Sequence, residues 1–155
     1  MSILLLAECW PYRNVEPNSF DTSQIRLLAQ ACNVTVKQLQ HLCTCRYVIE
    51  GYVPSFKRDV SYAKTVFNRV NNVFLRVMLR HDITIMIGKR LMNVLASSDA
   101  NFFIEYYTMA RNVVESIDLT VACIPNPMAE FYWKDTKNVD KVSKFMKHVF
   151  EVYGD

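Results

Sequence analysis

His41, Cys43 and Cys45 lie within five residues of one another, which raises the possibility of a metal site. Thiolate and imidazole groups are the ligands that zinc prefers in proteins. If the segment is helical, residues 41 and 45 share one face whereas residue 43 points roughly the opposite way, so the three cannot converge on one ion. No second Cys-x-x-Cys or His-x-x-x-His pair completes a tetrahedral set. We therefore expect no metal and no cofactor, and interpret the cysteines as buried thiols.

Nucleophilic catalysis requires a serine or cysteine beside a base that a third group orients. The three histidines, His41, His81 and His148, lie in no recognisable catalytic motif, and the chain has no Gly-x-Ser-x-Gly turn. These observations predict a protein that is not an enzyme. Catalysis remains an alternative, because catalytic groups assemble in space rather than along the sequence.

The composition indicates a folded globular chain. Of 155 residues, 51% are hydrophobic and 21% are charged, which excludes intrinsic disorder. The length predicts one domain over residues 1–155. Three glycines are too few for phosphate-cradling loops or for the many turns of a β-sandwich, so we expect an all-α fold.

The charge is modest, at +3, and the basic residues are spread along the chain. Their largest cluster, Lys137, Lys141, Lys144 and Lys147, has the spacing of a solvated helix face, so we expect no nucleic-acid partner. Five cysteines cannot all pair, which favours reduced thiols and an intracellular, cytoplasmic protein. No apolar run approaches about 18 residues, so no membrane-spanning segment is expected.

The spacing of apolar residues predicts amphipathic helices over 21–32, 35–50, 59–80, 100–123 and 139–153, with a short aromatic helix at 131–133. Gly154 stands where the last helix should end. Nine of the fifteen residues in 83–97 are apolar, which is typical of a buried helix. We therefore expect a bundle of seven to eight amphipathic helices around a central hydrophobic helix.

Three stretches of this pattern carry a resemblance to a known family. The C-terminal string Phe145-Met146-Lys147-His148-Val149-Phe150-Glu151-Val152-Tyr153-Gly154, with Trp133 upstream, is similar to the second homology region of the B-cell lymphoma (Bcl) apoptosis regulators. Phe67 to Leu75 resembles the helix before their first homology region, with Arg46-Tyr47 at about the family's distance before it. Gly88-Lys89-Arg90-Leu91 stands in for the family's Asn-Trp-Gly-Arg signature, although Met86-Ile87 replaces Asn-Trp. The chain resembles the divergent viral members most.

The resemblance implies an apoptosis inhibitor whose surface groove binds the BH-three helices of pro-apoptotic proteins, with mitochondrial association through those partners. The groove residues it implies are Tyr47, Val70, Phe74, Met78, Gly88, Lys89, Arg90 and Tyr153. By position, Lys89 would pair with the conserved Asp of the ligand, with Arg90 beside it. Core packing of Val70, Phe74 and Tyr153 and a solvated Lys89 are the alternatives for these residues. The alternative function is a helical adaptor of the same fold, acting through a flat face and as a homodimer.

Overall fold

The apolar segment Ile-Leu-Leu-Leu-Ala forms β1 (Ile3–Ala7), in which all five side chains are buried. The computed structural model describes residues 2–13, 20–93, 103–110 and 116–154. β1 pairs in parallel with β2 (Cys43–Tyr47) on one side and with β3 (Ile83–Ile87) on the other. A parallel strand paired on both sides is covered on both faces, which is why β1 is a continuous hydrophobic run.

The five strands form one sheet in the order β2-β1-β3-β5-β4. β5 (Ser116–Ile124) lies parallel to β3, and β4 (Phe103–Ala110) pairs with β5 in the antiparallel direction. β3 is therefore the middle strand. The parallel pairs are joined through helices, because two parallel strands cannot be connected by a tight turn.

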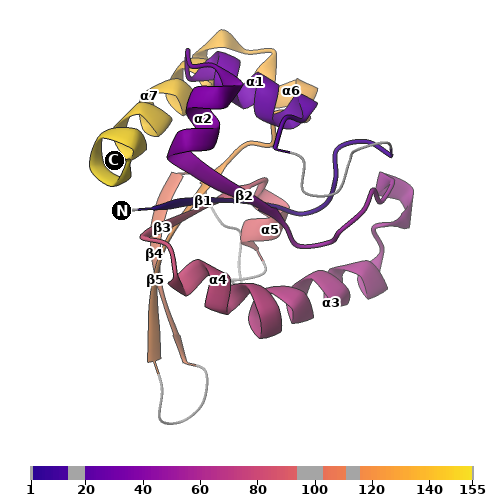
Figure 1. The fold of residues 1–155 in the computed structure, drawn as a ribbon. Coiled ribbons are helices and arrows are strands. Elements are labelled where there is room, and N and C mark those ends of the chain that lie inside the picture. The colour runs from indigo at the N-terminus through magenta and orange to yellow at the C-terminus, as the bar shows by residue number, and fades with distance from the viewer. Residues whose placement is uncertain (1, 14–19, 94–102, 111–115, 155) are drawn as a thin grey trace.

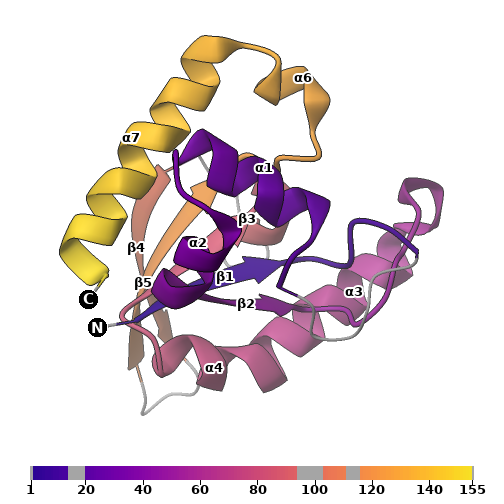
Figure 2. The ribbon, with the colours of Figure 1, turned by 45° about the horizontal axis from the view of Figure 1, so that its top comes forward.

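Helices cover the two faces of the sheet (Figure 1). One layer holds α1 (Ser23–Ala31), α2 (Val36–Leu42), α6 (Glu130–Trp133) and α7 (Thr136–Tyr153). The other holds α3 (Val60–Arg69), the π-helical turn η2 (Val70–Phe74) and α4 (Leu75–Leu79), while the one-turn helix α5 (Lys89–Met92) follows β3. Figure 2 shows the same separation after rotation of the molecule, with α7 and α3–α4 on opposite sides of the sheet.

Alternate strand residues face the two layers, which produces two hydrophobic cores. Ile3, Leu5 and Ala7 of β1 belong to the core beneath α1, α2 and α7, whereas Leu4 and Leu6 belong to the core beneath α3 and α4. β3 and β5 alternate in the same way. This period of two is the side-chain periodicity of a strand.

The expected all-α bundle is wrong, because the structure is an α/β sheet with helices on both faces. The central helix expected at 83–97 is replaced by β3 and α5, while residues 94–97 lie outside the described ranges. The segment Ile83-Thr84-Ile85-Met86-Ile87 is central, as expected, but as a strand. It is short, rich in β-branched residues and followed by Gly88, features that favour a strand over a helix.

Two further helix predictions are wrong for similar reasons. The helix expected over 35–50 ends at Leu42, and the chain continues as β2. The helix expected over 100–123 is replaced by the β4–β5 hairpin in the described part of that range. The small number of glycines is compatible with this sheet, because strands joined through helices need few tight turns.

Several helix predictions are confirmed. α3, η2 and α4 together cover the range 59–80, with Asp59 accepting a hydrogen bond from the Tyr62 amide at the first turn. α7 extends to Tyr153 and has Gly154 at its C-cap. α1 lies within the expected range 21–32, and the side chain of Thr22 caps its first turn. None of the helices in the described ranges is long and apolar enough to cross a bilayer.

Leu5→Ala tests the role of β1 in the core. Leu5 is fully buried, so its truncation should lower the free energy of unfolding by about 2–5 kcal/mol. Leu79→Ala is the matched control, because Leu79 is exposed and its loss should change stability by less than about 1 kcal/mol. Urea denaturation measures both values. Equal effects would contradict the placement of β1 at the centre of the fold.

Candidate functional site

The loops that follow β1, β2, β3 and β5 meet at one edge of the sheet, because parallel strands end on the same side. From β1 the chain passes through α1 and α2 to β2, and from β2 it passes through α3 and α4 to β3 on the other side of β1. Successive strands are thus added to one side of β1 first and then to the other, so the strand order reverses between β1 and β3. Open α/β sheets bind ligands at such a reversal, outside the carboxyl ends of the strands.

A cavity of about 320 Å³ lies at this edge. Its lining residues come from the loops after β1, β2 and β5 and from the start of α1: Glu8, Cys9, Trp10, Pro11, Gln24, Tyr52, Ser55, Arg58, Asn126, Met128 and Ala129. The wall therefore combines two aromatic rings, two carboxamides and an ionic group. The volume is at the lower end of the range of about 300–1,000 Å³ that is usual for small-molecule sites.

The carboxamides of Gln24 and Asn126 are joined to each other. Asn126 Oδ1 accepts one hydrogen bond of 2.9 Å from Gln24 Nε2 and another of 2.9 Å from the backbone amide of Met128. The indole N–H of Trp133 donates to the carbonyl oxygen of Pro125 at 3.2 Å and so holds the turn that carries Asn126. Both side chains are thus set in place before any ligand arrives.

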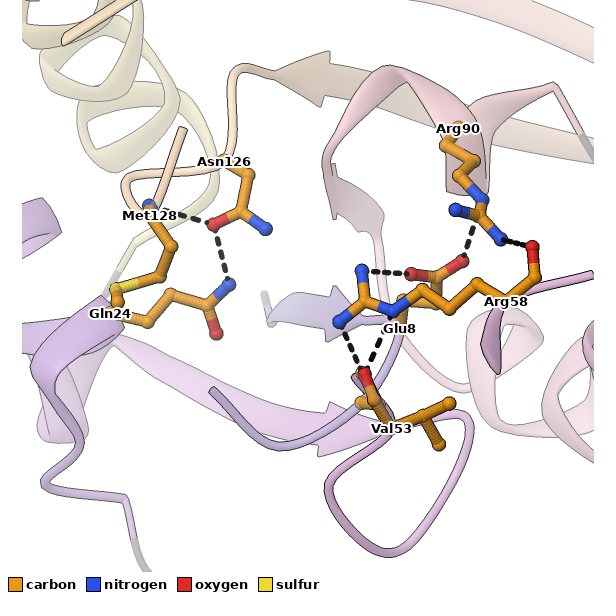
Figure 3. A network of polar contacts seen from close by, with 8 residues as sticks. Glu8, Gln24, Val53, Arg58, Arg90, Asn126 and Met128 are labelled. Carbon is orange, nitrogen blue, oxygen red and sulfur yellow. Dashed lines mark hydrogen bonds and ion pairs between the residues drawn. The ribbon is translucent and has the colours of Figure 1, made fainter. Parts of the chain in front are cut away.

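The backbone amide of Met128 also determines how the two carboxamides are oriented. A backbone N–H can only donate, so the Asn126 atom that it meets must be the oxygen, and the Gln24 atom that meets this oxygen must be the nitrogen. Asn126 Nδ2 is consequently turned away from Gln24, toward the side where Glu8 and Arg58 lie (Figure 3). Gln24 Oε1 remains as a free acceptor.

Gln24 Oε1 has no hydrogen-bond partner among the described residues, although the side chain is only 3% exposed. A buried carbonyl oxygen without a donor costs about 1–3 kcal/mol. Gln24 Oε1 is one of three such atoms in the described residues, with the Tyr62 hydroxyl and His81 Nδ1, and it is the one that belongs to a cavity-lining residue. An unpaired acceptor at Gln24 and the donor group of Asn126 thus lie on adjoining side chains.

Gly88 ends β3 next to this pair. Its φ of +108° is a conformation that other residues rarely adopt, and a Cβ there would lie 3.8 Å from the Cβ of Asn126. Its amide donates to the carbonyl oxygen of Ile124 at 2.9 Å. The positive φ therefore favours glycine at this position, while the space beside Asn126 would admit a Cβ.

The wall opposite the carboxamides carries an ion-pair cluster (Figure 3). The Glu8 carboxylate lies 3.3 Å from Arg58 Nη1 and 3.3 Å from Arg90 Nε. Arg58 also donates to the carbonyl oxygen of Val53 at 3.0 Å, and Arg90 donates to the carbonyl oxygen of Arg58 at 3.3 Å. Two guanidinium groups against one carboxylate leave this wall with one net positive charge.

Tyr62 packs against the same cluster, with the Arg90 guanidinium 5.5 Å from the centre of its ring. Burial, followed by the negative charge of Glu8, raises the pKa of Tyr62 far above its usual value. The phenol therefore keeps its proton at neutral pH and supports the ionic wall without adding charge to it.

Three of the residues implied by the family resemblance belong to the core. Val70, Phe74 and Met78 are almost completely buried beneath the sheet. Their spacing does place them on one helical face, as expected, but that face packs against β1, β3 and β5 instead of opening to solvent. Core packing was the alternative for Val70 and Phe74, and the structure has this arrangement.

The other implied residues are divided between the opposite core and the cavity edge. Tyr47 ends β2 and is buried, with its hydroxyl 3.5 Å from Thr22 Oγ1, while Tyr153 of α7 packs against the same core. Gly88, Lys89 and Arg90 lie at the carboxyl end of β3. Only this last group reaches the candidate site, where Arg90 pairs with Glu8 and Lys89 is exposed.

The metal interpretation of His41, Cys43 and Cys45 receives no support. His41 is exposed on α2, whereas Cys43 and Cys45 lie on β2. Burial raises the pKa of Cys45 to about 12 and that of Cys43 further, so both thiols stay protonated at neutral pH. In the described part of the chain no three His, Cys, Asp or Glu side chains are arranged to hold a metal ion.

The residues expected from the sequence did not include Glu8, Trp10, Gln24, Tyr52, Arg58 and Asn126. A signal was present, because Glu8-Cys9-Trp10 and Pro125-Asn126 directly follow apolar runs of five and four residues. Once those runs are interpreted as parallel strands, the residues after them must meet at one edge. Because residues 100–123 were expected to form a helix, the residues after them were not expected at this edge.

Glu8→Gln tests whether the ionic wall holds the site together. Glu8 and Arg58 side chains are 14% and 23% exposed, so removing the carboxylate charge leaves two guanidinium groups poorly compensated. We expect a loss of about 1–3 kcal/mol in the free energy of unfolding. Asp21→Asn is the control, because the Asp21–Arg26 pair is exposed and should contribute far less. Equal losses in urea denaturation would contradict the structural role of Glu8.

No protein-family model matches the chain, and no curated protein matches it at a significant level. The resemblance to the Bcl regulators therefore remains a prediction from short motifs, and the fold that it implied is not the fold observed. The function must be argued from the cavity itself.

Proposed function

We propose that the cavity binds a planar ring of the nucleobase type and recognises its hydrogen-bonding edge. The observation that carries the proposal is the buried, unpartnered Gln24 Oε1 next to the fixed amide of Asn126. Every nucleobase presents a donor and an acceptor side by side on its pairing edge. Such an edge satisfies Gln24 and Asn126 together.

The aromatic side chains of the cavity support the same ligand class. Trp10 and Tyr52 both line the cavity, and the Arg13 guanidinium lies 5.8 Å from the centre of the Tyr52 ring. Proteins that take up a single base commonly place its faces against aromatic side chains while amides read its edge. Trp10 is held in position by its own amide, which donates to the carbonyl oxygen of Gly51 at 2.9 Å.

The proposal concerns recognition and assigns no catalytic step. Glu8 is the carboxylate of the cavity wall, and both its oxygens face guanidinium groups. A carboxylate held in this way has a structural role and is poorly placed to accept a proton from a ligand. The wall instead supplies one net positive charge, which favours a ligand with electron-rich carbonyl oxygens or an attached phosphate.

The binding of BH-three helices and the adaptor alternative remain untested predictions, and no observation in the described residues favours them. Four of the side chains that should open into the groove, those of Tyr47, Val70, Phe74 and Met78, are buried. We therefore base the function on the cavity at the carboxyl edge of the sheet.

Titration with uridine, cytidine, adenosine and guanosine tests the proposal, with Trp fluorescence and calorimetry as readouts. At least one nucleoside should bind and quench fluorescence, and the quenching should be lost in Trp10→Phe. N3-methyluridine is a matched probe, because a methyl group replaces the hydrogen of the ring N–H that would donate a hydrogen bond to Gln24 Oε1. Equal binding of uridine and N3-methyluridine would contradict recognition through this edge, and no binding by any nucleoside would overturn the function.

Asn126→Asp and Gln24→Met test the two carboxamides directly. Asn126→Asp keeps the oxygen that accepts a hydrogen bond from the Met128 amide but removes the Nδ2 donor. Gln24→Met removes the unpaired acceptor Oε1. Each change should weaken nucleoside binding about tenfold or more. Gln24→Met should change the free energy of unfolding by less than about 1 kcal/mol, because the removal of a buried unpaired oxygen offsets the loss of the hydrogen bond to Asn126.

Gln30→Met is the matched control for Gln24→Met, since Gln30 is exposed on the same helix. It should change neither binding nor stability. A similar loss of binding in Gln30→Met would show that the effect comes from α1 in general and would contradict a specific role for Gln24.

A further inference from the structure

The turn beside the cavity exposes an aromatic ring that the core does not use. The helical turn η1 (Ser55–Lys57) begins at Ser55 and is followed by Arg58, and both of these residues line the cavity. Between them, Phe56 is 81% exposed, the largest exposed fraction among the large apolar side chains of the described residues. A single exposed apolar side chain is common, but this one lies between two cavity-lining residues, so a ligand that extends out of the cavity could stack on it.

The same edge carries exposed positive charge. Lys57 follows Phe56 on η1, and Arg13 lies over the ring of Tyr52 in the cavity wall. Among the acids near this edge, Glu8 pairs with two arginines and Asp59 accepts a hydrogen bond from the amide of Tyr62, while Glu50 is exposed. We call Arg13, which lies over Tyr52, and Phe56 and Lys57, which lie on η1, the rim, because both groups flank the cavity.

We propose that the ring in the cavity is one base of a single-stranded nucleic acid, that the neighbouring base stacks on Phe56, and that the adjoining phosphates contact Arg13 and Lys57. Basic grooves with aromatic side chains are the arrangement by which proteins hold single strands, since every base has a face that can stack. This inference rests on the proposed function and extends it from a single base to a strand.

This proposal depends on the local charge at the rim and not on the charge of the whole chain. The net charge of +3 and the scattered basic residues predicted no nucleic-acid partner. Binding depends on the local field at the site, however, and the rim places two cations beside an exposed ring. On this proposal the lysines of α7, which are the densest basic cluster in the sequence, take no part, because α7 packs on the other layer from η1 and α3.

Binding of r(U)8 and (dU)8, compared with uridine and uridine 5′-monophosphate, tests the inference by fluorescence anisotropy and calorimetry. Octamers of A and C, with their nucleosides, extend the comparison to other bases. The octamer should bind at least tenfold more tightly than the nucleoside at low salt. Its affinity should fall with salt concentration, because phosphate contacts release counterions.

Phe56→Ala should weaken octamer binding about fivefold or more, which is the loss expected for one base–aromatic stack. It should leave nucleoside binding unchanged, because Phe56 does not line the cavity. Phe67→Ala is the matched control, since Phe67 is also exposed but lies on α3 away from the rim. Lys57→Gln and Arg13→Gln should each reduce the salt dependence of the octamer affinity. Lys37→Gln on α2 should leave that salt dependence unchanged.

The outcomes separate the inference from the function on which it rests. If a nucleoside binds but the octamer binds no better, or if uridine 5′-monophosphate matches the octamer, the strand proposal is overturned and base recognition stands. If Phe56→Ala and Phe67→Ala weaken octamer binding equally, the assignment of Phe56 is overturned. If no probe binds, the proposed function itself fails.

Discussion

The parallel pairing of β1 with both β2 and β3 is the constraint on which the rest of the structure depends. The paired residues are in register, so Ala7 lies level with Tyr47 on one side and Ile87 on the other. All three strands therefore end at the same height, and the loops that follow them must share one edge. The cavity exists because this pairing brings together side chains from residues 8 to 129 of the chain.

Stability and recognition are divided between the interior and this edge. The interior is apolar on both faces of the sheet, with Thr84 as the buried polar residue of β3. The edge, by contrast, holds an ion-pair cluster, joined carboxamides and a carbonyl oxygen without a partner. Gln24 Oε1 is the one buried atom without a partner, among those of the described residues, that belongs to a residue lining this cavity, and the proposed ligand would supply the missing donor.

Secondary structure was predicted most reliably from local sequence for helices that pack one face against the sheet and expose the other face to water. α7 and the α3–α4 segment were predicted in type and nearly in extent, because their 3.6-residue periodicity reflects an asymmetric environment. β1 and β3 lie in a symmetric environment, apolar on both faces, and therefore show no periodicity. Such short apolar runs do not distinguish a buried strand from a buried helix by pattern alone.

The sequence by itself determined the apolar runs, the helix caps and the amphipathic helices, since these depend on neighbours within about one turn. Only the tertiary structure decided that residues 83–87 form the middle strand and that Glu8, Gln24, Arg58 and Asn126 line one cavity. Strand pairing joins residues far apart in the chain, such as Ile3 with Ile83, and no local preference encodes it. The candidate site is a product of that pairing, so it became visible only when the strands were placed side by side.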